Sequence, residues 1–86
     1  MFVIVAYDVK QKRVGKLLKI CRKYLVHVQK SVFEGALTEA KLKALKSELK
    51  RSIDCDYDAI CIYSTTMPQA FYKEQIGVVE KHPNII

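Results

Sequence analysis

The sequence predicts an α+β fold: a ferredoxin-like sandwich in which two helices cover one face of an antiparallel sheet. Segments typical of strands alternate with segments of helical spacing, in the order strand, helix, strand or hairpin, helix, strand, strand. The 86 residues are 50% hydrophobic and 28% charged, which fits one globular domain over residues 1–86 and excludes disordered, collagen and coiled-coil chains.

The first two elements are marked by a change of period. Phe2–Tyr7 is an unbroken apolar, β-branched and aromatic run that Asp8 ends, so we expect a strand covered on both faces. From Gln11 to Tyr24 the apolar residues recur at the helical period. The stripe that they form comprises Val14, Leu17, Leu18, Cys21, Tyr24 and Leu25.

The segment Leu25–Leu37 is strand-like, but its alternation breaks after Lys30-Ser31, which indicates a bend, a bulge or a tight hairpin. Thr38 can cap a second helix, with Glu39 in the first turn. The buried stripe of that helix comprises Leu42, Leu45, Leu49 and Ile53.

A turn, a third strand and a short fourth strand complete the expected order. The third strand is Tyr57–Tyr63 and the last is Phe71–Gly77. Asp54, Asp56 and Asp58 alternate without the Gly or Glu of a calcium loop, so we interpret them as a solvated turn.

Two helices cover only one sheet face, yet the strands Phe2–Tyr7 and Tyr57–Tyr63 look apolar on both faces. A bare apolar face of this size is uncommon in soluble monomers. We therefore expect a homodimer that packs the other sheet faces together about a two-fold axis.

The charge is strongly asymmetric. The net charge is +6, and between Lys10 and Lys30 the chain has eight Lys or Arg and no Asp or Glu. This favours phosphate binding over mere solvation, and the excess of lysine favours contacts that do not read base sequence. The predicted nucleic-acid-binding residues are Lys10, Lys12, Arg13, Lys16, Lys19, Arg22 and Lys23.

Asp8 is the principal candidate for chemistry. It ends a buried strand just before the basic helix, and magnesium binds one or two carboxylates together with waters and phosphate oxygens. Two copies of Asp8 across a dimer axis could hold one Mg²⁺ and activate water for phosphodiester hydrolysis. The competing interpretation, favoured by spacing alone, makes Asp8 the N-cap of the helix with Gln11 at the capping-box position.

The remaining candidates have structural alternatives. Tyr7 and Phe33 could stand near this rim, although core packing is the more common role of such aromatics. His27 fits a packing or interface residue. The three cysteines match neither a zinc site nor a disulfide scaffold, which favours a reducing, cytoplasmic compartment. No segment has the roughly 20 apolar residues of a membrane span.

The strand ending in Tyr7-Asp8, the basic helix after it and the run Val28–Gly35 (VQKSVFEG) resemble the CRISPR-associated Cas2 family of small spacer-acquisition proteins. The resemblance covers almost the whole chain. It implies a ferredoxin-like homodimer with facing sheets, in which the C-terminal segment (Phe71–Gly77 and Ile85-Ile86) adds a strand to the partner's sheet.

The resemblance also implies a function in antiviral defence. The dimer would bridge the CRISPR-associated integrase while foreign DNA lies along the assembly. Some members are magnesium-dependent endonucleases on single-stranded RNA or double-stranded DNA, with the aspartate matching Asp8 in both chains holding the metal. Tyr7, Arg13 and Phe33 match further positions associated with activity.

Three hypotheses remain at this point. The chain is a DNA-binding adaptor in spacer acquisition, a metal-dependent endonuclease centred on paired Asp8, or a toxin-type ribonuclease or RNA-binding module unrelated to spacer acquisition. Phe33-Glu34-Gly35 matches the exposed aromatic motif of RNA-recognition domains poorly, which disfavours RNA binding alone.

Overall fold

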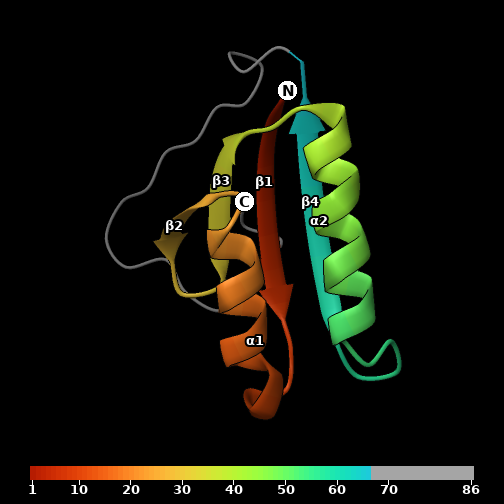
Figure 1. Ribbon diagram of the computed structural model, residues 1–86. Coiled ribbons are helices and arrows are strands. Elements are labelled where there is room, and N and C mark those ends of the chain that lie inside the picture. The colour runs from red at the N-terminus through yellow and green to blue at the C-terminus, as the bar shows by residue number, and fades with distance from the viewer. Residues whose placement is uncertain (67–86) are drawn as a thin grey trace.

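The computed structural model describes residues 1–66, which form a four-stranded antiparallel sheet with two helices against one face (Figure 1). The strand order β2-β3-β1-β4 places β1 between β3 and β4. This confirms the predicted ferredoxin-like α+β class. The elements are β1 (Phe2–Asp8), α1 (Gln11–Arg22), β2 (Val26–Gln29), β3 (Val32–Ala36), α2 (Glu39–Ser52) and β4 (Ala59–Thr65).

Strand β1 is buried on both faces, as its unbroken apolar run predicts. Val3, Val5 and Tyr7 alternate toward the helices and join the core that α1 and α2 cover. Ile4 and Ala6 point to the opposite face and are only 4% and 1% exposed. We expected this outer face to be bare in a single chain, and in its middle that expectation is wrong.

The outer face keeps exposed apolar side chains nearer its edges. Tyr63 of β4 pairs with Ile4 and is 39% exposed, and Val26 of the edge strand β2 is 68% exposed. Both residues lie on the same face as Ile4, because directly opposed residues in antiparallel strands share a face. The apolar surface available to a partner therefore lies on the flanking strands.

Helix α1 buries Leu17 and Cys21 as predicted, and also Ile20, which the predicted stripe did not include. The helix does not begin as the capping interpretation of Asp8 requires. Lys10 is the N-cap residue, and no side chain caps the helix. The interpretation of Asp8 as the N-cap is therefore wrong, because Asp8 still belongs to β1 and two residues separate it from the first helical residue.

The segment after α1 is the tight hairpin that the broken alternation suggested. β2 and β3 pair antiparallel, and Lys30 in the turn has a left-handed φ of 39°. Gly35 on β3 allows close packing, because a Cβ there would lie 3.2 Å from Leu25 Cδ2. This contact brings the end of α1 and the hairpin together.

Helix α2 begins as predicted, whereas β4 begins later than predicted. The Thr38 hydroxyl accepts a hydrogen bond from the Lys41 amide at 3.1 Å, which confirms the cap. β4 starts at Ala59, so Tyr57 and Asp58 belong to the preceding turn. The predicted strand Phe71–Gly77 and the tail at 78–86 lie outside the described residues. Within residues 1–66, no helix is long and apolar enough to cross a membrane.

Candidate nucleic-acid and metal site

Asp8 offers an exposed carboxylate at the end of a buried strand. It pairs with Ala59, the first residue of β4, and lies one position beyond the buried Tyr7. Among residues 1–66 its carboxylate has neither a hydrogen-bond partner nor an ion-pair partner. Since β1 leads into the connection to α1, this free carboxylate lies at the end of a central strand, close to where the basic helix begins.

One chain supplies only part of a metal site. In the described part of the chain, no group of three or more His, Cys, Asp or Glu residues is placed to hold an ion. An exposed carboxylate without a protein partner is nevertheless the donor that magnesium takes, with water filling the other positions. Asp8 therefore offers one carboxylate of the kind that magnesium binds, and residues 1–66 supply no cluster of further ligands around it.

Tyr7 and Phe33 lie in the core on the helix side of the sheet, away from the face of Asp8. Tyr7 is 3% exposed and Phe33 is fully buried, with the two ring centroids 6.2 Å apart. Burial raises the pKa of the Tyr7 hydroxyl to about 12, in keeping with its place in the core. The structural interpretation of both residues is confirmed.

His27 extends the same row of rings at the edge of the sheet. Its ring stacks on Phe33 with a centroid distance of 4.6 Å, and Nε2 is 2.5 Å from the Lys30 carbonyl oxygen. This is the packing role expected for His27. Cys21 is likewise a core residue, and burial raises the pKa of its thiol to about 12.

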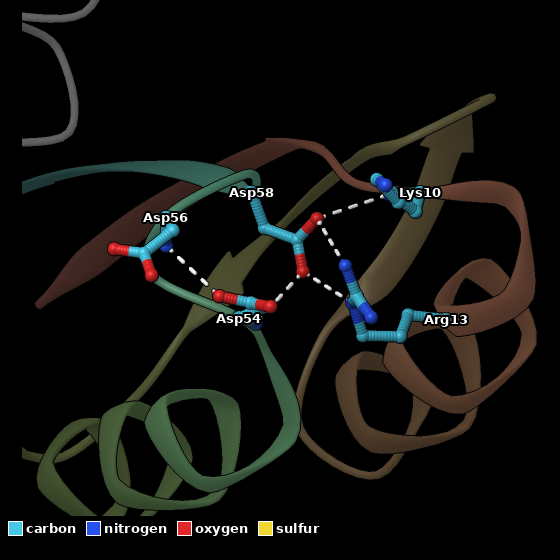
Figure 2. Close-up of polar contacts among 5 residues, drawn as sticks. All are labelled: Lys10, Arg13, Asp54, Asp56 and Asp58. Atoms are coloured by element: carbon cyan, nitrogen blue, oxygen red, sulfur yellow. Dashed lines mark hydrogen bonds and ion pairs between the residues drawn. The ribbon is translucent and has the colours of Figure 1, made fainter.

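Asp58 anchors a buried ion pair that the sequence did not reveal (Figure 2). Its side chain is fully buried and that of Arg13 is only 16% exposed. Asp58 Oδ1 accepts hydrogen bonds from the Lys10 amide and Arg13 Nη2, both at 3.0 Å. Oδ2 accepts from Arg13 Nε and, at 2.9 Å, from the Asp54 amide. We call this set of contacts the Asp58 clamp.

The Asp58 clamp joins the start of α1 to the turn before β4. Hydrogen bonds from Arg13, followed by those from the two backbone amides, hold the pKa of the Asp58 carboxyl well below its usual range. The interpretation of all three aspartates as a solvated turn is therefore wrong for Asp58. Arg13 is placed as the ion-pair partner of Asp58, whereas the lysines of α1 project into solvent.

The lysines of α1, together with Lys23 at its C-cap, form a continuous exposed stripe. Their spacing puts them on one side of the helix, away from the buried residues. The members of this lysine stripe are Lys12, Lys16, Lys19 and Lys23.

The other predicted basic residues differ in their partners. Lys23 pairs with Glu48 of α2, and the ammonium of Lys10 lies 4.4 Å from the centroid of the Tyr57 ring. Arg22 is exposed beside the stripe. Within residues 1–66, Lys12, Lys16 and Lys19 make no ion pair, so their charges are available to phosphate groups.

A family model described as "CRISPR associated protein Cas2" matches residues 1–72. The chain belongs to the Cas2 family. The matched range contains Asp8, the Asp58 clamp and the lysine stripe. Membership favours a CRISPR protein over the unrelated toxin or RNA-binding module considered from the sequence.

Individual Cas2 proteins resemble the chain over most of its length. The CRISPR-associated endoribonuclease Cas2 of Thermotoga maritima is 47% identical over 78 residues, which cover 91% of this chain and 90% of that protein. The protein of the same description from Methanocaldococcus jannaschii is 41% identical over 83 residues, covering 96% of this chain and 72% of that protein.

Solved structures agree with the fold. The crystal structure of Streptococcus pyogenes Cas2 at pH 6.5 superposes with a TM-score of 0.75 at 33% identity, covering 90% of this chain and all of that one. A hypothetical protein from Thermus thermophilus gives a TM-score of 0.71 at 32% identity, covering 95% of this chain and 93% of that one. The sheet and helices described above are thus those of Cas2 structures.

Proposed function

We propose that this chain is a cytoplasmic nucleic-acid-binding homodimer of CRISPR adaptation that cleaves single-stranded RNA with magnesium. The observation that carries the proposal is the free carboxylate of Asp8, exposed at the end of the buried strand β1 and followed by the lysine stripe. The descriptions of the relatives as endoribonucleases support the choice of RNA.

Each group of residues has a distinct role in this proposal. Asp8 of both chains would hold one magnesium ion, which when bound activates water and neutralises charge on the phosphate. Lysines at the start of the stripe hold the backbone of the nucleic acid through its phosphates. Tyr7 and Phe33 fix the end of β1 by core packing, and the Asp58 clamp fixes the connection that follows Asp8.

The second chain is needed because one chain supplies a single carboxylate at this position. Asp8, Tyr63 and Val26 belong to the same outer sheet face, and the two apolar residues leave surface for a partner to bury. A two-fold axis through that face would bring two copies of Asp8 toward each other. Light scattering that finds only monomer at micromolar concentration would contradict this arrangement.

Magnesium dependence tests the cleavage activity. We expect purified protein to cleave single-stranded RNA in magnesium and to lose this activity when EDTA removes the ion, because the lysines bind but cannot activate water. The measurement is a time course on labelled single-stranded RNA, RNA duplex and double-stranded DNA of one sequence. Cleavage that persists unchanged in EDTA would exclude a metal-dependent mechanism.

A second function, favoured by the lysine stripe, is to bridge the CRISPR-associated integrase while duplex DNA lies along the dimer. Lysine ammonium groups along one side of a helix suit phosphate contacts that are independent of sequence. This role requires no chemistry at Asp8. Binding and cleavage can therefore be separated by substitution.

Replacing Lys12, Lys16 and Lys19 by glutamine in one triple variant should weaken DNA binding and make the affinity less dependent on salt concentration. For duplex DNA, the slope of log K against log salt concentration becomes shallower by about 0.9 for each phosphate that the protein no longer neutralises. Fluorescence anisotropy at several salt concentrations measures the slope.

A matched triple variant on α2 controls for the change in net charge. Lys43, Lys46 and Lys50 are also exposed but lie on the other helix, outside the lysine stripe. Their replacement by glutamine should leave most of the salt slope in place. Equal effects of the two triple variants would show that net charge alone drives binding and that the stripe has no special role.

A further inference from the structure

Tyr57 is an exposed aromatic residue close to the proposed site. It is 67% exposed, although a tyrosine ring usually buries most of its apolar surface. The ammonium of Lys10 lies 4.4 Å from its ring centroid, a cation–π contact. The ring therefore contacts the Lys10 ammonium, and most of its remaining surface is accessible to another planar group.

The position of Tyr57 follows from the pairing of β1 with β4. Asp8 pairs with Ala59, and this is the last pair at that end of the two strands. Lys10 lies two residues after Asp8, and Tyr57 lies two residues before Ala59. Lys10 and Tyr57 therefore contact each other just beyond the last strand pair, on the side of the free carboxylate of Asp8.

The turn that carries Tyr57 is fixed by internal hydrogen bonds. The amides of Tyr57 and Asp58 both donate to the Asp54 carbonyl oxygen, at 3.0 and 2.8 Å. The Asp54 amide donates to the buried carboxylate of Asp58, and the Asp56 amide donates to the Asp54 carboxylate (Figure 2). Because the backbone is already ordered, little conformational entropy is lost when a ligand meets the ring.

We propose that Tyr57 is a base-stacking residue that selects an unpaired nucleobase beside the phosphate bound near Asp8. Aromatic rings bind single strands by stacking on bases, which a base inside a duplex cannot offer. The ammonium of Lys10 would meet the adjoining phosphate. The inference rests on the proposed function, because it specifies that the strand presented at Asp8 is single-stranded.

The test compares Tyr57→Ala with Tyr57→Phe, which keeps the ring. Binding is measured in EDTA, so that no RNA is cleaved, with a single-stranded RNA carrying 2-aminopurine and with the RNA duplex of the same sequence. We expect Tyr57→Ala to raise the Kd for the single strand about tenfold and to remove stacking-dependent quenching of the fluorescent base. Tyr57→Phe should preserve both properties, and duplex binding should not change in either variant.

Asp56→Asn is the matched control in the same turn. Asp56 is exposed, so removing its charge should strengthen binding of single strand and duplex alike, in a salt-dependent way. The inference is overturned if Tyr57→Ala weakens both nucleic acids equally, as a dimer contact or a fold defect would, or leaves the quenching intact.

The outcomes also separate this inference from the proposed function. Wild-type protein that quenches the base through Tyr57 but never cleaves RNA in magnesium contradicts the endonuclease and leaves the stacking role in place. Magnesium-dependent cleavage with normal single-strand binding by Tyr57→Ala contradicts the stacking role alone. Failure of wild-type protein to bind either RNA contradicts both.

Discussion

Replacing Asp58 with alanine is expected to lower the melting temperature by roughly 10–20 °C. The substitution leaves the guanidinium of Arg13, which is mostly buried, without its counter-ion. It also removes the acceptor of the Lys10 and Asp54 amides. Breaking one side of a buried ion pair costs much more than the pair contributes as a whole, because the remaining charge stays desolvated.

Thermal and urea unfolding followed by circular dichroism measure this effect. Asp56→Ala is the matched control, since Asp56 lies in the same turn but is exposed, and it should shift the melting temperature by only a few degrees. Replacing both partners with apolar residues, as in Arg13→Met with Asp58→Leu, should recover part of the loss. A change for Asp58→Ala as small as that of the control would show that the clamp contributes little.

The same carboxylate gives the stability a defined pH dependence. The folded-state pKa of Asp58 lies below the unfolded value, so its contribution is complete above the unfolded pKa of about 4. It is lost as the pH falls through the folded-state pKa. Between about pH 5 and pH 2, the free energy of unfolding should therefore fall more steeply for the wild type than for Asp58→Ala.

Asp58 also shows where prediction from the sequence stops. β1, the stripe of α1 and the cap of α2 each follow from residues within a few positions of one another. β1 and the cap are confirmed, and the stripe is confirmed except that it missed Ile20. The burial of Asp58 depends on Arg13, which is 45 residues earlier in the sequence. A local pattern cannot distinguish it from the exposed Asp56, so the strand was expected to start at Tyr57 and Asp58 was expected in solvent.

In the candidate site, too, the sequence predicts some features of Asp8 and not others. The end of a buried apolar strand located Asp8, and the exposure of its carboxylate was foreseeable from that position. The choice between helix cap and metal ligand was not, because both roles suit an aspartate before a helix. The structure places Lys10 at the N-cap of α1, and its amide donates to Asp58, a contact with a residue 48 positions away that no local pattern reveals.

Asp8→Asn should abolish RNA cleavage, lowering the rate by more than about a hundredfold in magnesium. Asparagine keeps the size of the side chain but removes the negative charge that a hard cation requires. Binding of the single strand should persist, because the lysine stripe and Tyr57 are unchanged. Rates from single-turnover cleavage and affinities from anisotropy give the comparison, and cleavage that survives in Asp8→Asn would refute the role of Asp8.

Mixed dimers test whether one ion is shared between two copies of Asp8. When wild type and Asp8→Asn are mixed in equal amounts and exchange freely, about one quarter of the dimers carry two intact aspartates. A shared site then retains about a quarter of the activity per dimer, whereas two independent sites retain about half. The cleavage activity per dimer varies with the square of the wild-type fraction for a shared site and linearly with that fraction for two independent sites. A linear dependence would place a complete site within each chain, which is not expected because residues 1–66 hold no group of three or more His, Cys, Asp or Glu residues placed to bind an ion.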